Sequence, residues 1–420
     1  MSFILDTPSS PITELSSIGR NNLSLFFDQA KADTFLGEWV NALNDRVDVQ
    51  QAQELFLDIV ARGLWCGNDH AAPDDDQGWY TCMEKNGIAA EMQRRIMDPL
   101  YKHIRMTRRC GFWVLESIDT TFRGLWETLE GGQALTRPLG MQQDTTMSLA
   151  ATSAPKNNTE SDFVYTVMDK TRMRDMQLEI FLVVLVSLHI TFEIPKLPPT
   201  NMKISTLGLL KDDGSLQNLH QLIRHHAPGD FHCQSVITDG YYFLADREVA
   251  LYYANYAKLR SPLTSTEIML VQVAIPKRAK EILSRETDGE RPRVAEIHWH
   301  DPVWKTMVWF CRRNGEDYIR VRDCDLGRVI CASLVIGSIP TRCNNDYRDV
   351  SSPEQMTEHS ALRTNPAKDC PWLATQWMFR HDEGEAFLRL HARLKAYVLT
   401  EREHKDWHDQ QYRRHGAYLS

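Results

Sequence analysis

Residues 238–254, TDGYYFLADREVALYYA, join an aromatic strand pattern to a helical pattern through an acidic turn. Residues 240–244 are aromatic and apolar, which predicts a strand. Asp246 and Glu248 suit the first turn of a helix, where the helix dipole favours negative charge. After a polar loop, residues 265–273, STEIMLVQV, place a single glutamate before an apolar strand pattern. Together the patterns predict a strand, a helix and a second strand in succession.

The rest of the chain divides into regions of different periodicity. Residues 1–133 repeat apolar side chains at helical spacing, whereas 134–162 are rich in Ser, Thr, Asn and Gln, which is typical of a flexible linker. Strand patterns begin after it, so 163–382 is predicted to be an α+β domain, and 383–420 an amphipathic C-terminal helix. The predicted fold class is therefore α+β, with a helical N-terminal region and a helical tail.

The composition is that of a globular protein with a sizeable core. Of the 420 residues, 42% are hydrophobic and 25% are charged, which excludes collagen-like, fully disordered and small disulfide-framework classes. A net charge of −8 argues against a protein that coats nucleic acid, although it allows a local basic groove. The nine cysteines form no CxxC pair, and the longest apolar run, 180–188, is too short to span a bilayer. No secretory signal is recognisable at the start, so we expect a cytoplasmic protein with reduced thiols and no membrane partner.

The region from about residue 203 to 283 resembles the ADP-ribosyltransferase superfamily, on its poly(ADP-ribose) polymerase-like side. The resemblance depends on a Gly-x-Tyr-Phe strand that leads into a helix with Ala and Tyr residues, and on a Glu at the start of a later strand. The matching residues are Gly240, Tyr241, Tyr242, Phe243, Asp246, Ala250, Tyr252, Tyr253 and Glu267. The resemblance implies a split β-sheet domain that moves ADP-ribose from NAD, its co-substrate, to a small-molecule or macromolecular acceptor.

The resemblance also implies which residues act on NAD. Cleavage of the nicotinamide–ribose bond builds positive charge on the ribose carbon, and a nearby carboxylate stabilises that charge. Glu267 is the implied catalytic carboxylate, and Tyr242 is the implied aromatic wall for the cationic nicotinamide ring. The other implied cofactor contacts are Gly240, Tyr241, Tyr252, Tyr253, and, at the first-strand position where the family carries a His or an Arg, Ser205 and Thr206.

This prediction requires one particular geometry. The ring of Tyr242 and the carboxylate of Glu267 must lie on adjoining strands and face a shared hollow. Each residue also has an ordinary structural interpretation, because aromatic clusters on strands often form cores and a lone glutamate before an apolar strand is often solvated.

Two other functions remain open. In size, cytosolic character and lack of common motifs, the chain is similar to the fungal arginine-containing cyclodipeptide synthases of secondary metabolism. Those enzymes join residues carried by two aminoacyl-tRNAs and depend on a short acidic motif, for which Asp175 and Glu179 are the candidate pair, with tRNA as the partner. The third possibility is a non-catalytic interaction protein that retained the transferase fold.

No metal site is expected. The three aspartates at 74–76 are predicted to form a solvated loop. His298 and His300 could share one face of a strand, but no third ligand is recognisable nearby, which disfavours zinc.

Overall fold

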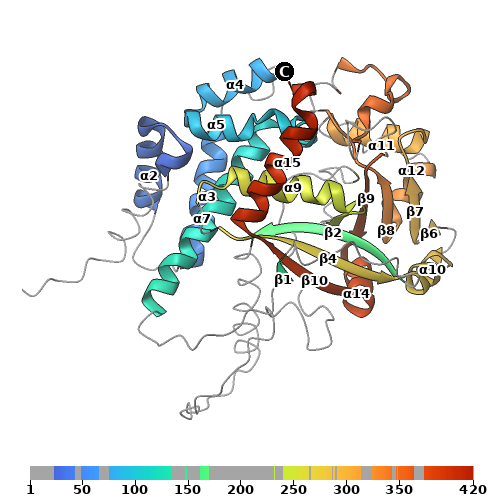
Figure 1. Ribbon diagram of the computed structural model, residues 1–420. Coiled ribbons are helices and arrows are strands. Elements are labelled where there is room, and N and C mark those ends of the chain that lie inside the picture. Colours follow the sequence, from blue (N-terminus) through green and yellow to red (C-terminus); the bar gives the residue numbers. More distant parts are fainter. Residues whose placement is uncertain are drawn as a thin grey trace, which may run out of the picture.

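The chain folds into a mixed β-sheet with helices on both faces (Figure 1). The computed structural model describes residues 23–42, 49–65, 75–134, 147–148, 161–169, 231, 240–263, 266–285, 287–288, 291–313, 324–342, 347, 349–363 and 373–419. This combination of helices with a largely antiparallel sheet confirms the predicted α+β class.

Eight described strands form the main sheet in the order β1-β10-β4-β2-β3-β9-β8-β7. Neighbouring strands are antiparallel except at the two edges, where β1 pairs with β10 and β7 pairs with β8 in parallel. The strand bounds are β1 Met147–Ser148, β2 Ser161–Asp169, β3 Gly240–Leu244, β4 Ile268–Pro276, β7 Val294–Ile297, β8 Leu334–Ser338, β9 Thr375–Arg380 and β10 Arg393–Leu399, with a separate hairpin of β5 Thr287–Asp288 and β6 Arg291–Pro292.

The sheet consists of two halves that meet between β2 and β3. In the described residues, the register of these two strands contains the single pair Tyr165 and Leu244. By contrast, β2 pairs with β4 along its whole length, and so does β3 with β9. The two halves are therefore joined by far less backbone pairing than each contains.

The helices have amphipathic patterns that match the faces they cover. Side chains of a strand alternate between faces, so each half of the sheet needs cover on both sides. α9 and α11 lie over one face, while α10 and α14 lie over the other (Figure 1). The helix bounds are α2 Gln29–Ala42, α3 Val49–Trp65, α4 Asp76–Lys85, α5 Ala90–Ile96, η1 Pro99–Tyr101, α6 Lys102–Arg105, α7 Cys110–Ala134, α9 Arg247–Arg260, α10 Lys277–Arg285, α11 Pro302–Arg312, α12 Cys324–Cys331, η4 Pro353–Gln355, η5 Glu358–Ser360, α14 His381–His391 and α15 Glu401–Leu419.

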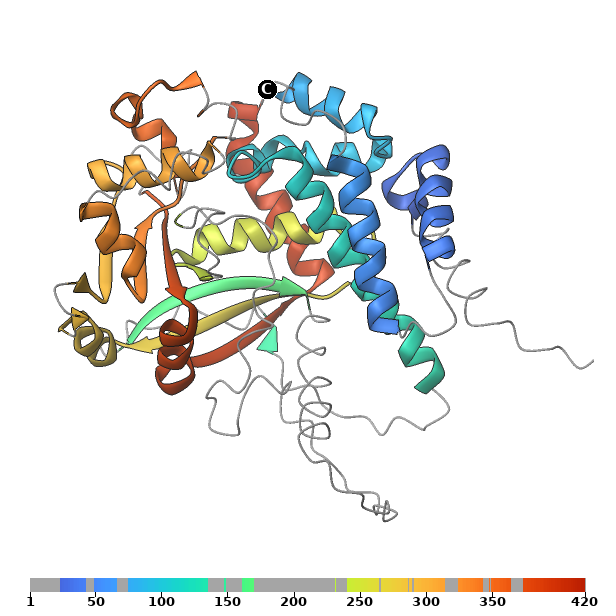
Figure 2. The ribbon, with the colours of Figure 1, turned by 180° about the vertical axis from the view of Figure 1, so that it is seen from behind.

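The N-terminal helices share one apolar core with α9 and α15. The ring of Tyr101 stacks against Tyr256 of α9, with centroids 5.0 Å apart, and against Trp407 of α15 at 6.1 Å. Buried Arg260 joins the same regions, because it contacts the rings of Tyr256 and Trp113 and pairs with Glu116. Figure 2 shows these helices against α9 and α15 from behind.

The strand–helix–strand unit predicted from residues 238–273 is confirmed as β3, α9 and β4. The predicted C-terminal helix over 383–420 is wrong in part, because β10 separates α14 from α15 and pairs with β4 inside the sheet. The predicted linker over 134–162 overlaps the end of α7 and the start of β2, and it contains β1. Within the described residues, no helix has both the length and the apolar character needed to cross a bilayer.

Candidate functional site

The predicted aromatic wall, Tyr242, is partly buried and packs against an apolar cluster. Its neighbours Tyr241 and Phe243 point to the α10 and α14 face, so Tyr242 points to the opposite face, where it packs against the cluster that contains Met378. The backbone N–H of Phe231 donates to the Tyr242 hydroxyl at 3.4 Å. The ring of Tyr242 therefore has a packing role in the structure.

The predicted carboxylate, Glu267, is exposed and directly precedes β4. β2 lies between β3 and β4. Tyr165 of β2 pairs with Leu244 on one side and with Gln272 on the other. Since both pairings are antiparallel, Tyr242 and Leu270, two residues before these partners, lie level with each other across β2. The two strands are roughly 10 Å apart across β2, and Glu267 lies three residues before Leu270, which adds a similar distance along the strand. The structure does not bring the ring and the carboxylate together.

The two helix tyrosines lie in the core that α9 shares with the N-terminal helices. Tyr252 packs edge-on against Trp407, with centroids 4.8 Å apart, and its hydroxyl donates to Gln411 at 3.3 Å. Burial raises the pKa of Tyr252 to about 12. The hydroxyl of Tyr253 is 3.0 Å from that of Thr107. Both rings thus lie in the core that α9 shares with the N-terminal helices.

Four predicted site residues lie outside the described residues. These are Ser205 and Thr206 at the first-strand position and the acidic pair Asp175 and Glu179. Their contribution to an NAD site or to a tRNA-dependent site stays a prediction.

A different glutamate meets the predicted strand. The hydroxyl of Tyr241 donates to Oε2 of Glu385 on α14 at 2.8 Å, and Arg389 donates to Oε1 at 2.6 Å. Glu385 is only 7% exposed. Gly384 lets α14 approach β9 closely, because a Cβ there would lie 2.9 Å from the backbone carbon of Phe379. Sequence reasoning missed Glu385, although it lies in an acidic run that opens an amphipathic helix.

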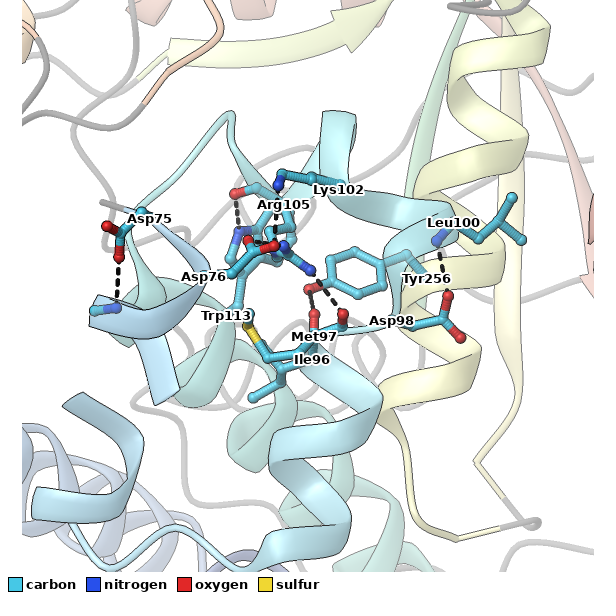
Figure 3. Close-up of polar contacts among 11 residues, drawn as sticks. Asp75, Asp76, Ile96, Met97, Asp98, Leu100, Lys102, Arg105, Trp113 and Tyr256 are labelled. Atoms are coloured by element: carbon cyan, nitrogen blue, oxygen red, sulfur yellow. Dashed lines mark hydrogen bonds and ion pairs between the residues drawn. The ribbon is translucent and has the colours of Figure 1, made fainter. Parts of the chain in front are cut away.

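The aspartates at 75 and 76 are engaged in structural contacts (Figure 3). Asp75 caps α4 by accepting from the backbone N–H of Gly78 at 2.6 Å, and Asp76 forms ion pairs with Lys102 and the buried Arg105. Burial raises the pKa of Asp76, but the hydrogen bond from Lys102 and the charge of Arg105 outweigh it and lower the pKa. In the part of the chain that the structure describes, no three His, Cys, Asp or Glu residues could hold a metal ion.

A cluster of titratable side chains holds α15 against η1 and α9. Asp98 accepts hydrogen bonds from Tyr412 at 2.8 Å and from the backbone of Leu100 at 2.9 Å, and it lies 3.5 Å from Nε2 of His408. Burial raises the pKa of Asp98, but these hydrogen bonds together lower it. His404 lies 2.9 Å from Oδ1 of Asn255, and burial lowers its pKa to about 4.

Two large apolar side chains on the α10 and α14 face are open to solvent. Ile282 of α10 is 49% exposed and Leu390 of α14 is 69% exposed; they are the large exposed hydrophobics of the described residues. Three α10 cations are also exposed: Lys277, Arg278 and Arg285. We call these five residues the α10–α14 surface.

Comparisons with family models, with curated proteins and with solved structures found no match to this chain.

Proposed function

We propose that this chain is an interaction protein on an α+β scaffold and that it binds a partner through the α10–α14 surface. The observation that carries the proposal is the exposure of Ile282 and Leu390, by 49% and 69%, on the two helices that cover one face of the sheet. An exposed apolar patch rimmed by polar side chains is typical of a site that contacts another protein. The partner is a protein, in line with the non-catalytic interaction protein that the sequence leaves open.

The positions of Tyr242 and Glu267 support an interaction protein over ADP-ribose transfer by this pair. The nicotinamide ring and the ribose carbon of NAD are directly bonded, so the aromatic wall and the carboxylate would need to lie within contact of neighbouring atoms. Tyr242 packs against an apolar cluster, whereas Glu267 immediately precedes β4, which lies on the other side of β2 from β3.

The test is nicotinamide release by the full chain supplied with NAD and varied acceptors. We expect neither the wild type nor the Glu267→Gln variant to release nicotinamide above a protein-free blank. Release by the wild type that disappears in Glu267→Gln would contradict the proposal and restore the transferase prediction.

A second candidate is ADP-ribose transfer from NAD with Glu385 in place of Glu267. It is favoured by the contact between Glu385 and Tyr241, which places a carboxylate beside a tyrosine of the Gly-Tyr-Tyr-Phe strand, although the resemblance implies Tyr242 with Glu267 for these roles. A carboxylate beside the ribose would stabilise positive charge on its carbon, and in the structure Arg389 pairs with this carboxylate.

The second candidate has its own variants. It predicts nicotinamide release by the wild type that is lost in Glu385→Gln and retained in Glu281→Gln, which changes an exposed glutamate on α10. Equal release from Glu385→Gln and the wild type would exclude a role for Glu385.

A further inference from the structure

α10 presents a stripe of alternating charge and apolar surface to solvent. Arg278, Ile282 and Arg285 are four and three residues apart, so they share one side of the helix, and all three are exposed. Ala279 and Leu283 are buried against the sheet. The outward stripe thus consists of two cations with an isoleucine between them, and exposed Glu281, three residues after Arg278 and four before Arg285, shares that side.

The end of α14 and the start of α10 lie at the same end of the paired strands β4 and β10. Arg393, the first residue of β10, pairs with Ala274 of β4, and α10 begins three residues later at Lys277. Leu390 lies three residues before Arg393 in the last turn of α14, and 69% of it is exposed. Leu390 is therefore a second exposed apolar side chain on the side of the sheet that α10 and α14 cover (Figure 1).

Three of the four α10 cations fall into two groups. Lys280 is occupied, since it pairs with Asp162 at 2.5 Å and its ammonium lies 4.8 Å from the centre of the Trp377 ring. Arg278 and Arg285 instead flank Ile282 on the exposed side. Lys280 anchors the helix to the sheet, whereas these two arginines are available to a partner.

Resting on the proposed function, we infer that the partner is an acidic amphipathic helix of another protein. Its matching stripe would carry a leucine or isoleucine flanked by carboxylates one turn before and one turn after it. Each carboxylate would face one arginine, Arg278 or Arg285, and the apolar residue would contact Ile282. An anionic membrane is the alternative ligand for the same two arginines, and anionic lipid vesicles test it in the experiment below.

The experiment uses the full chain and two labelled synthetic peptides, with binding followed by fluorescence anisotropy. The first peptide is helical and carries glutamates four residues before and three residues after a leucine. The second has lysines in place of those glutamates. The variant is the double change Arg278→Glu and Arg285→Glu, and Arg402→Glu, an exposed position on α15, is the matched control.

We expect the wild type and Arg402→Glu to bind the glutamate peptide equally and the double variant to bind it at least about tenfold more weakly. We also expect the double variant to bind the lysine peptide more tightly than the wild type does. The inference is overturned if the wild type does not bind the glutamate peptide, or if the double variant binds it as the wild type does. It is also overturned if the wild type binds anionic lipid vesicles and the double variant does not. Because nicotinamide release plays no part in these measurements, they can fail while the proposed function stands, and the reverse.

Discussion

His404 should make the stability of this protein strongly dependent on pH. Its side chain is buried between α15 and α9, and its ring nitrogen Nδ1 lies 2.9 Å from Oδ1 of Asn255. Asn255 donates its own amide to the carbonyl of Leu251, so Oδ1 is an acceptor and Nδ1 of His404 carries the proton. Glu401, Lys258, His408 and Asp98 also act on the ring, but burial is the largest cause of its lowered pKa.

The direction and size of the effect follow from linkage. The pKa of His404 falls from 6.5 to about 4 in the folded protein, so the unfolded chain takes up the proton first as the pH falls. Stability that is fully present above the unfolded pKa is therefore lost between pH 6.5 and about pH 4. At 1.36 kcal/mol for each pKa unit, the loss is about 3 kcal/mol.

The assay is urea unfolding, followed by circular dichroism, at neutral pH and at several pH values down to about 4. We expect His404→Gln to be less stable than the wild type at neutral pH but to lose about 3 kcal/mol less on acidification. His391→Gln is the comparison: burial also lowers the pKa of His391, but that residue is only partly buried and lies on α14, so its variant should change the pH dependence less than His404→Gln does. The reasoning is refuted if the wild type and His404→Gln lose the same free energy of unfolding over this pH range.

Three further substitutions test the packing. Arg260→Ala should lower the free energy of unfolding by about 3–5 kcal/mol, because it breaks a buried ion pair and two ring contacts. The control Arg402→Ala changes a 91% exposed side chain and should alter stability by less than about 0.5 kcal/mol. Chemical denaturation measures both variants. Gly384→Ala should lower stability by about 1–3 kcal/mol, because its Cβ would meet backbone atoms at 2.9–3.1 Å. In contrast, a Cβ at Gly37 would have nothing within 4 Å, so Gly37→Ala should stabilise α2 by about 0.5–1 kcal/mol. A Gly384→Ala protein with the melting temperature of the wild type would contradict the close packing of α14. Tyr241→Phe should cost about 1–2 kcal/mol through the lost hydrogen bond to a carboxylate, and an unchanged melting temperature would show that the bond adds nothing to stability.

Local sequence patterns predicted local structure well. The aromatic run of β3, the acidic first turn of α9 and the apolar run of β4 each depend on neighbouring residues, and all three lie where they were predicted. β10 was missed because its alternation of exposed and buried side chains, RLKAYVL, is short and lies between two helices. A helical interpretation of the whole tail therefore masked a pattern with a period of two.

The site was harder to predict because it depends on which strands become neighbours. Glu267 and Tyr242 were expected on adjoining strands, but β2 inserts between β3 and β4, and neither residue records that order in its local sequence. The contact of Tyr241 with Glu385 joins residues 144 positions apart, so spacing could not reveal it. Alternation along β3 does separate Tyr241 from Tyr242, but it does not say which face is covered by which helix.

The contact between Tyr412 and Asp98 spans 314 positions, which has a consequence for synthesis on the ribosome. At about 5–20 residues per second, Asp98 waits roughly 15–60 s for its tyrosine to be translated. Throughout that interval the nascent chain lacks Trp407, which stacks on Tyr101. The N-terminal helices would therefore present an incomplete apolar surface to cellular chaperones until translation has nearly finished.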